Sequence, residues 1–195
     1  MATTNNKQLL MDVVKTGSGK DVGLKCRLKM PEMISYIGML AKDVVVHLRS
    51  PGTDGSVLAV DFSGAQIDYP RNVAVTAGVV TGTVAVTGID QYGDTVTETI
   101  TITSGGTVVG SQAFAFITGI VYDVATGTGD ITVKMGSKVG LPVDLSYTSL
   151  KAVSVSAGVT TFVNGLGSEY TVNETYDTVE LTAISAAASY IFTVA

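Results

Sequence analysis

The sequence predicts a mainly β protein: an antiparallel β-sandwich, immunoglobulin-like or jelly-roll in topology, with an extended N-terminal arm and at most one short helix. Three observations lead to this prediction. From residue 69 onward, short runs rich in Val, Ile and Thr alternate with clusters of Gly, Asn, Asp and Ser, as they do in sandwiches and barrels. No helical segment separates these runs, so neighbouring strands are expected to pair antiparallel. Hydrophobic residues make up 46% of the 195 residues, which is enough to bury a core without disulfides.

The chain is expected to divide into two parts. Residues 1–68 form an N-terminal arm with short strand and helix segments, and residues 69–195 form the β-sandwich domain. The arm is irregular at its start, apart from a short strand within residues 22–30. The further predicted strands are 43–49, 57–62, 72–77, 83–89, 95–103, 114–124, 130–135, 151–156, 159–163, 178–183 and 189–194.

Residues 31–41, "PEMISYIGMLA", are the one helix candidate. Pro31 suits the first turn of a helix, where its missing N–H has no partner to lose. Met33, Ile37 and Leu40 recur at the spacing of one helix face. We therefore expect a short amphipathic helix here.

The stretch "VTGIDQYGDTVTETI", residues 86–100, predicts a β-hairpin rather than a metal site. In 95–103 the odd positions are all Thr and the even positions are apolar except for Glu98, which is the two-residue period of a half-buried strand. Gly93 can adopt the positive φ of a tight turn. Asp94 then belongs to the turn and Asp90 closes the preceding strand, and Asp residues at turns commonly bond their own backbone. The pattern of a calcium-binding EF-hand loop is absent.

Glu98 breaks this pattern because its parity places a carboxylate on the apolar face of the strand. A buried carboxylate without a partner is costly, which leaves two alternatives open. Either Glu98 lies at an edge or interface, or it lies inside and forms a structural ion pair with Arg71, one of four cations after residue 50. Glu98 would also guard an edge strand against pairing.

The charges are few and unevenly distributed. Charged residues make up 15% of the chain, below the roughly 25% of an average domain, which suits a subunit that buries surface in an assembly. Residues 1–49 hold eight of the 12 Lys and Arg and four of the 17 Asp and Glu, so they carry +4 and the remainder carries −9. The basic front is either a solvated arm or is steered onto an acidic partner. Nucleic acid is not expected, because its binders are usually basic overall.

The sequence lacks the residues of most catalytic and metal sites. Cys26 is the one cysteine and His47 the one histidine, so no intrachain disulfide is possible and zinc ligation is not expected. A Ser–His–Asp site would have to use His47, which lies in a predicted strand without a nucleophile motif nearby. We therefore predict a protein that is not an enzyme and needs no cofactor.

Two further segments invite a function that their residues do not support. Residues 16–21, "TGSGKD", resemble part of a phosphate-binding loop, but Val14 stands where that motif needs its first Gly and Asp21 replaces the Ser or Thr. Residues 99–122 are uncharged and long enough to span a membrane. They are rich in Thr, Gly and β-branched residues, which favours strands, so no membrane partner is expected.

Four pieces of sequence, in order, resemble a β-rich structural protein family of tailed bacteriophages. The pieces are P-R-N-V, a V-T-G-x-D-x-x-G hairpin followed by T-E-T, V-G-x-x-A-F, and G-x-K-x-G-L-P. They lie at residues 70–73, 86–93 with 97–99, 109–114 and 136–142. The similarity covers residues 69–195. It implies a virion component without catalytic residues.

Within that family, the resemblance favours a head decoration (cement) protein that binds and stabilises the outer capsid lattice. The expected partners are the major capsid protein and further copies of the chain, with a trimer favoured. The expected location is the outer surface of a virion whose components are made in the host cytoplasm. The candidate lattice contacts are the cations of the arm, Lys15, Lys20, Lys25, Arg27 and Lys29.

Two alternatives place the chain elsewhere on the particle. As a fibre module it would recognise a host glycan, with Tyr69, Tyr92 and Tyr122 as exposed stacking residues unless they cap the edges of the core. As a tail-tube or connector subunit it would assemble into rings or tubes.

Overall fold

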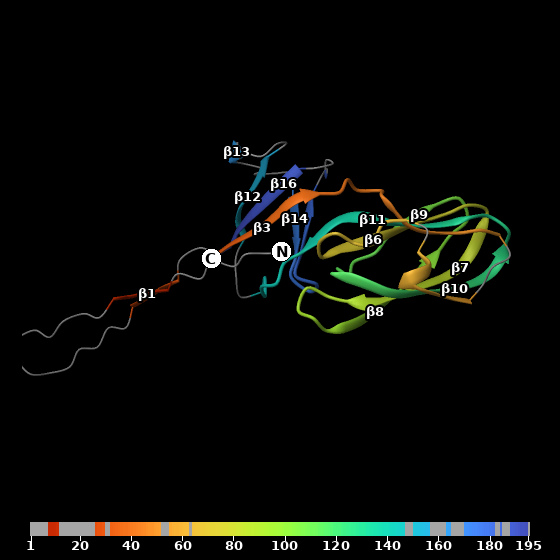
Figure 1. The fold of residues 1–195 in the computed structure, drawn as a ribbon, viewed down its shortest axis with the longest axis horizontal. Coiled ribbons are helices and arrows are strands. Elements are labelled where there is room, and N and C mark those ends of the chain that lie inside the picture. The colour runs from red at the N-terminus through yellow and green to blue at the C-terminus, as the bar shows by residue number, and fades with distance from the viewer. Residues whose placement is uncertain are drawn as a thin grey trace, which may run out of the picture.

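The computed structural model describes residues 8–11, 26–29, 32–51, 55–62, 64–146, 150–156, 163–164, 170–181, 184 and 188–194. These residues are mainly β (Figure 1). The strands are β1 (Gln8–Met11), β2 (Cys26–Lys29), β3 (Glu32–Met39), β4 (Val45–Arg49), β5 (Gly55–Leu58), β6 (Arg71–Ala77), β7 (Val80–Ile89), β8 (Thr95–Ile102), β9 (Thr107–Val109), β10 (Phe116–Gly127), β11 (Ile131–Gly140), β12 (Leu150–Ser156), β13 (Val163–Asn164), β14 (Tyr170–Asn173), β15 (Thr178–Leu181) and β16 (Ala188–Val194). One 3₁₀ turn, η1 (Ala59–Asp61), follows β5.

Strands β4 to β11 form a sandwich of two antiparallel sheets. One sheet has the order β5-β10-β7-β8, and the facing sheet has the order β4-β11-β6-β9. The first strand therefore pairs with the eighth, the second with the seventh, the third with the sixth and the fourth with the fifth. This is the strand order of a jelly roll. The predicted β-sandwich is confirmed. Of the two topologies expected for it, immunoglobulin-like and jelly-roll, the strand order matches the jelly roll.

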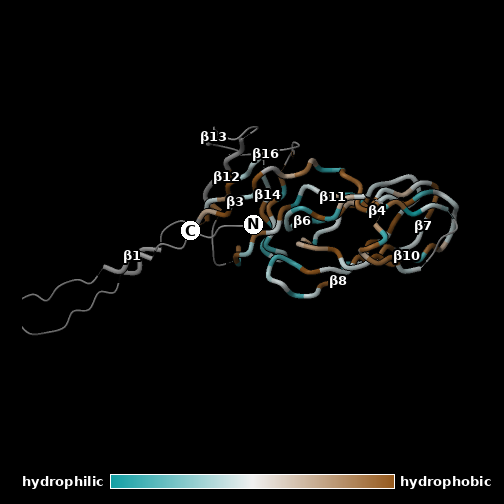
Figure 2. Tube along the Cα trace, viewed as in Figure 1, coloured by the Kyte–Doolittle hydropathy of each residue, from teal (hydrophilic) through white to brown (hydrophobic). Residues whose placement is uncertain are grey.

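The core of the sandwich lies between the two sheets. Val73 and Val75 of β6 are fully buried, as are Val84 and Val86 of β7. Each pair is two residues apart, as strands require when one face is buried. Every such Val contributes about 1.5–3 kcal/mol through the apolar surface it removes from water. The hydropathy along these strands can be followed in Figure 2.

A second, smaller core lies beside the sandwich; we call it, with its strands β3 and β12 to β16, the small lobe. The sheet β13-β12-β16-β3 contributes to it, and strands β15 and β14 extend the sandwich sheet toward it. Strand β11 belongs to both cores: Ile131 and Val133 are buried in the sandwich, whereas Val139 is buried in the small lobe. The pairing of β11 with β6 shifts register between Met135 and Val139, where the strand passes from one core to the other.

The predicted helix at residues 31–41 is wrong, because this segment forms strand β3. Ile34 and Tyr36 are buried two residues apart, and β3 pairs antiparallel with β16 along its length. Met33 and Ile37, which suggested a helix face, are exposed. Pairing with β16, which is remote in sequence, overrides the local helical spacing.

The predicted domain boundary at residue 68 is also wrong. Strands β3, β4 and β5 precede it, yet they pair with β16, β11 and β10 respectively. These three strands are part of the two cores rather than of an arm. Only β1 and β2, among the described strands, pair with each other and with no other strand.

Most predicted strands are confirmed, with shifted ends. The segment 57–62 is an exception, since β5 ends at Leu58 and η1 follows. Strands β1, β9 and β14 were not predicted; they have four, three and four residues, too few for a periodic pattern to stand out. Of the predicted strand 159–163, residues 159–162 lie outside the described residues. Residues 99–122 contribute to β8, β9 and β10, in keeping with the strands expected there.

Candidate functional site

The four sequence pieces that resemble the phage family meet at the end of the sandwich next to the small lobe. The backbone of Arg71 exchanges two hydrogen bonds with that of Phe114, at 3.1 and 3.0 Å. The N–H of Gly140 donates to the carbonyl oxygen of Pro70 at 2.8 Å, and that of Gly110 donates to the carbonyl oxygen of Val73 at 2.9 Å. Three of the pieces thus lie side by side. We call this cluster, residues 70–73, 86–93, 97–99, 109–114 and 136–142, the motif network.

Asn72 ties these pieces together from a fully buried position. Its Nδ2 donates to the carbonyl oxygen of Gly110 at 2.7 Å, and its Oδ1 accepts from the N–H of Lys138 at 2.9 Å. Gly136 lies against the same side chain, and a Cβ at that position would overlap the amide group of Asn72. The Asn of one piece and the Gly of another therefore require each other.

The hairpin piece joins the network through Glu98 and Gly88. The Oε1 of Glu98 accepts from the N–H of Ser111 at 2.6 Å. Gly88 lies against the ring of Phe114, where a Cβ would be too close to a ring carbon. All four pieces are thus in mutual contact.

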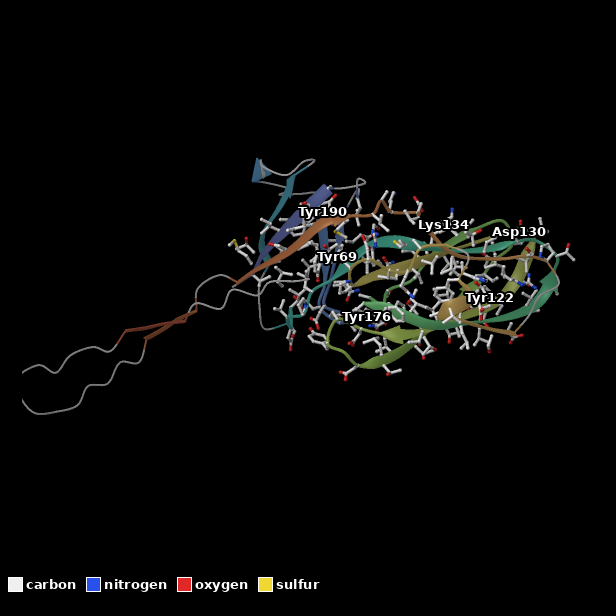
Figure 3. All side chains as sticks on the ribbon, viewed as in Figure 1. Tyr69, Tyr122, Asp130, Lys134, Tyr176 and Tyr190 are labelled. Carbon is white, nitrogen blue, oxygen red and sulfur yellow. The ribbon has the colours of Figure 1, made fainter. Side chains whose placement is uncertain are left out.

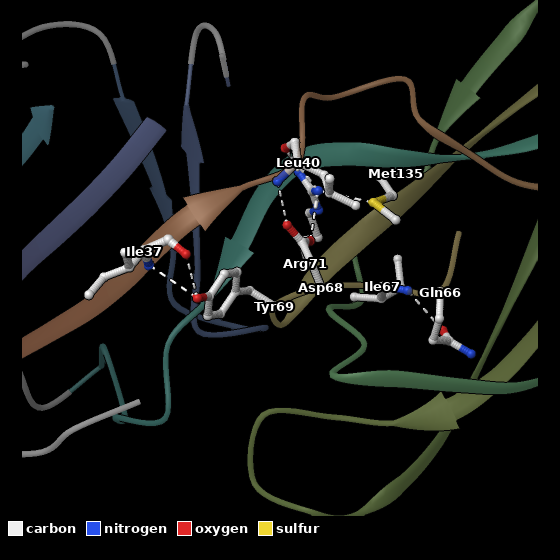
Figure 4. Close-up of polar contacts among 8 residues, drawn as sticks. All are labelled: Ile37, Leu40, Gln66, Ile67, Asp68, Tyr69, Arg71 and Met135. Atoms are coloured by element: carbon white, nitrogen blue, oxygen red, sulfur yellow. Dashed lines mark hydrogen bonds and ion pairs between the residues drawn. The ribbon is translucent and has the colours of Figure 1, made fainter. Parts of the chain in front are cut away.

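Arg71 is fully buried and clamps the chain that follows β3 (Figure 4). Its Nη2 lies 2.7 Å from the Oδ1 of Asp68, and both Nη1 and Nη2 donate to the carbonyl oxygen of Leu40 at 3.0 Å. The Oδ2 of Asp68 accepts from the N–H of Leu40 at 2.6 Å. Burial lowers the pKa of Arg71, and the carboxylate of Asp68 opposes that shift. The ion pair and the peptide of Leu40 form a polar cluster between the two lobes, in which the buried Nε of Arg71 has no hydrogen-bond partner among the described residues.

The predicted ion pair between Arg71 and Glu98 is therefore wrong. Asp68 is three residues from Arg71 and reaches its guanidinium directly, whereas Glu98 is turned toward Ser111. The alternative of an edge position holds for the strand, since β8 is the last strand of its sheet and Glu98 is half-buried, but the Oε2 of Glu98 is buried without a hydrogen-bond partner among the described residues. The aspartate at i−3 was the available sequence signal for the partner of Arg71.

The turn at residues 90–94 is held by the side chain of Asp90, which bonds backbone groups of the turn, as expected of an Asp at a turn. The Oδ1 of Asp90 accepts from the N–H groups of Tyr92 and Asp94 at 2.8 and 2.9 Å. Gly93 has a φ of 93°, which favours glycine. Among the residues that the structure describes, no group of three or more His, Cys, Asp or Glu is arranged to hold a metal ion.

The candidate lattice contacts fall largely on the arm. Lys15, Lys20 and Lys25 lie outside the described residues, as does the phosphate-loop-like segment 16–21. Arg27 and Lys29 lie on β2, which pairs with β1 from Gln8↔Lys29 to Met11↔Cys26. The structure thus places two of the five cations on a short hairpin that shares no ladder with the described strands of either lobe.

A pocket of about 370 Å³ opens between β4, β5 and β10 and contains the one histidine. The Nδ1 of His47 lies 2.7 Å from the hydroxyl of Tyr122, so this hydrogen bond joins the two sheets. Burial lowers the pKa of His47 and raises the pKa of Tyr122. Arg49, Ser50 and Ser56 also line the pocket. The described residues around His47 show no acid that orients it and no serine that hydrogen-bonds to it, which are the partners a Ser–His–Asp triad needs.

Two of the three tyrosines considered for glycan stacking are used in packing. Tyr122 is 2% exposed and lies within the sandwich (Figure 3). The hydroxyl of Tyr69 donates to the carbonyl oxygen of Ile37 at 2.7 Å and accepts from its N–H at 3.2 Å. Tyr92 is 48% exposed, and its hydroxyl donates to the Oδ2 of Asp177 at 2.6 Å.

Sequence reasoning also missed Tyr36, which joins the two lobes. It is almost fully buried in β3, and its hydroxyl donates to the carbonyl oxygen of Gly140 in β11 at 2.7 Å. Its ring centre lies 4.7 Å from that of Tyr69 and 5.8 Å from that of Phe192. Burial raises its pKa, with a smaller contribution from Tyr69.

No described helix is long and apolar enough to cross a membrane. In comparisons with known proteins, no family model, curated protein or solved structure matches the chain.

Proposed function

We propose that this chain is a non-enzymatic structural protein of a tailed-bacteriophage virion, most specifically a capsid decoration (cement) protein. The observation that carries the proposal is the motif network. Four short pieces resemble the phage family, and in the fold they contact one another through Arg71, Asn72, Glu98 and Gly136. Pieces that require each other form one structural unit, so their joint occurrence is more specific than four separate matches.

The roles of these residues also support a structural function. The buried side chains of Arg71 and Asn72 bond mainly to backbone groups, as in a scaffold that fixes one conformation. None of them is arranged as a nucleophile with its base. The jelly roll occurs in capsid and lectin domains among others, so the fold agrees with the proposal without selecting it.

In this proposal the arm attaches the protein to the outer head lattice. Residues 1–30, which precede the strands of the two cores, hold six Lys or Arg and two Asp, so they carry +4 and the remainder carries −9; the arm thus has the charge that would attract an acidic lattice surface. A two-stranded hairpin is marginally stable in water by itself, and β1 and β2 pair with no other described strand. The capsid surface would supply the contacts that order it. The partners are thus the major capsid protein and further copies of this chain.

A fibre module that binds a host glycan is the second candidate, and the pocket beside His47 is the observation that favours it. Its lining combines Arg49, Ser56 and Tyr122 with the apolar side chains of Leu48 and Val57, and polar groups that converge beside apolar side chains are common in ligand sites. The burial of Tyr122 and the contacts of Tyr69 remove two expected stacking residues, which leaves decoration as the stronger proposal. No feature of the described residues specifically favours a tail-tube or connector role.

The test is co-sedimentation of the full chain with capsid shells that lack it. Wild-type protein is expected to bind in saturable amounts, at a fixed ratio to the capsid subunit. Reversing two arm charges, Arg27→Glu with Lys29→Glu, is expected to weaken binding at least tenfold. The matched control is Lys42→Glu with Lys134→Glu, which makes the same change in net charge on the body of the protein and should bind as wild type does.

Salt supplies a second readout, because exposed charge pairs are screened at high ionic strength. Binding through the arm should weaken as sodium chloride rises from about 0.05 to 0.5 M. Absence of binding to any shell, together with rings or tubes in the free protein, would overturn the decoration proposal in favour of the tail. Binding to a glycan array without binding to shells would favour the fibre module.

A further inference from the structure

The outer face of the sheet β5-β10-β7-β8 is a broad surface with almost no charge. Its side chains form rows across the strands, because the register aligns one residue from each strand. The rows are Ser56–Val121–Ala85–Thr99, Leu58–Gly119–Thr87–Thr97, Asp123–Thr83–Thr101 and Phe116–Ile89–Thr95. Asp123 is the one charged residue in these rows. We call this surface the threonine face.

Large apolar side chains are exposed on one half of the threonine face. Leu58 is 62% exposed, Phe116 is 45% exposed and Val121 is 43% exposed. They lie on the neighbouring strands β5 and β10, so they form one patch rather than scattered contacts with solvent. Exposed apolar patches on a folded domain usually mark an interaction surface.

The other half of the face consists of threonines whose hydroxyls partly satisfy one another. The hydroxyls of Thr87 and Thr97 lie 2.9 Å apart, and those of Thr81 and Thr126, at one end of the sheet, lie 2.7 Å apart. The hydroxyl of Thr118 donates to the carbonyl oxygen of Thr87 at 3.1 Å. Hydroxyls that already bond within the sheet lose fewer hydrogen bonds to water when a partner covers them. The free-energy cost of association is therefore lower.

The character of this face restricts what can bind it. A charged partner would lose its hydration at this face. Apart from Asp123, no charged side chain in these rows would compensate that loss. The partner must therefore be uncharged and flat where it makes contact. The opposite sheet meets this requirement less well, because Lys134 stands in the row Lys134–Ala74–Val109 of its outer face, whereas the ammonium of Lys138 donates to the carbonyl oxygen of Gly110. The threonine face of a second copy does meet it.

Charge also restricts which face two copies can share. Residues 50–195 carry −9, so two copies repel each other over most of their surface. The threonine face brings only one carboxylate from each copy to the contact. We propose that the threonine face is a self-association surface, on which a second copy of this chain packs face to face in a two-fold arrangement.

The size of the face suits a weak, reversible pair. Four strands at about 4.8 Å spacing and eight residues at about 3.4 Å each give roughly 500 Å² in plan. Standard interfaces bury about 800 Å² of accessible surface per partner, and transient ones bury less. The pair is therefore expected to form at tens to hundreds of micromolar. It is independent of the arm and of the proposed capsid binding.

The experiment is sedimentation equilibrium of the full chain over concentrations of about 10 to 300 μM. Wild-type protein is expected to show a two-chain species that grows with concentration. The variant Thr99→Lys with Val121→Lys places two cations in the central row and should associate at least tenfold more weakly. The matched control, Thr132→Lys with Val109→Lys, makes the same changes on the outer face of the other sheet and should associate as wild type does.

A spin-label measurement tests the geometry without disturbing the charge of the face. With Cys26→Ser to remove the native thiol, nitroxides at Val121→Cys are expected about 20 Å apart between copies, because facing sheets pack about 10 Å apart. Nitroxides at Thr132→Cys should lie about 30 Å apart or more, since two further sheet spacings intervene.

Four results would overturn the proposal: a single-chain wild type throughout the range, a three-chain species, equal association of the face variant and wild type, or short distances from Thr132 rather than Val121. Salt separates this proposal from the previous one. Pairing through an uncharged face should persist in sodium chloride and strengthen in sulfate, whereas capsid binding through the arm should weaken. Either property can thus fail while the other is observed.

Discussion

Gly136 leaves open the space that the side chain of Asn72 occupies. The two residues lie on the paired strands β11 and β6, and a Cβ at position 136 would overlap the Asn72 amide. That amide holds Gly110 on one side and Lys138 on the other. The pair explains why two separated sequence pieces occur together: each is shaped to receive the other.

The first prediction concerns this pair. Gly136→Ala should destabilise the protein by about 3 kcal/mol, since overpacking costs about 1–3 kcal/mol and each displaced hydrogen bond about 1 kcal/mol. Urea denaturation measures the change. Gly119→Ala is the control, because a Cβ there would lie at an ordinary 3.4 Å from its nearest neighbour, the carbonyl oxygen of Val57.

A double-mutant cycle sharpens that test. On an Asn72→Ala background the space at position 136 is no longer contested, so Gly136→Ala should cost clearly less than it does in wild type. If Gly136→Ala lowered the free energy of unfolding equally on both backgrounds, Asn72 and Gly136 would act independently. That result would contradict the contact between them.

The second prediction concerns the buried ion pair of Arg71 and Asp68. Asp68→Asn removes the charge that compensates a fully buried guanidinium, and breaking a buried pair from one side typically costs about 3–5 kcal/mol. Asp130→Asn, a change at an exposed site, serves as the control. A loss below about 1 kcal/mol for Asp68→Asn would show that solvent compensates Arg71.

The third prediction concerns pH. Burial lowers the pKa of His47 from its ordinary value of about 6.5. The unfolded chain therefore takes up the proton first as the pH falls, and stability contributed by neutral His47 is lost below about pH 6.5, down to its lowered pKa. Denaturation midpoints at pH 7.5, 6.5 and 5.5 should fall more steeply for wild type than for His47→Gln. Parallel slopes would mean that His47 does not titrate differently on unfolding.

The fourth prediction concerns the contact between the hairpin turn and the small lobe. Tyr92→Phe removes the hydrogen bond to Asp177 and should cost about 1 kcal/mol, the usual net value of such a bond. Tyr176→Phe is the matched control, because the structure describes no hydrogen bond from its hydroxyl. If both variants lose the same stability, the bond to Asp177 has no specific role.

Strand positions could be predicted where alternation was clear. In 95–102 the threonines are exposed, and Ile100 and Ile102 are buried, as the two-residue period requires. The same reasoning failed at β3, where Met33, Ile37 and Leu40 have helical spacing but Ile34 and Tyr36 are the buried residues. Helical and strand periods overlap over short runs, and only the presence of β16 decides between them.

The partners of the polar residues were harder to predict than the strands. Arg71 was recognised as a residue that needs a carboxylate, yet its cluster also depends on the carbonyl oxygen of Leu40. A backbone group contributed from 31 positions away leaves no mark in the sequence. The strand order has the same origin: β4 pairs with β11 and β5 with β10, and neither pairing can be inferred from the number of strands.

The most direct test of the central claim, that this chain is a decoration protein, is its copy number in purified particles of a phage whose genome encodes it. Quantitative mass spectrometry would compare peptides of this chain with peptides of the major capsid protein. The account predicts a fixed ratio to the capsid subunit, comparable with the number of capsid subunits or a simple fraction of it. Absence from the particle, or only a handful of copies as expected for a tail component, would contradict it.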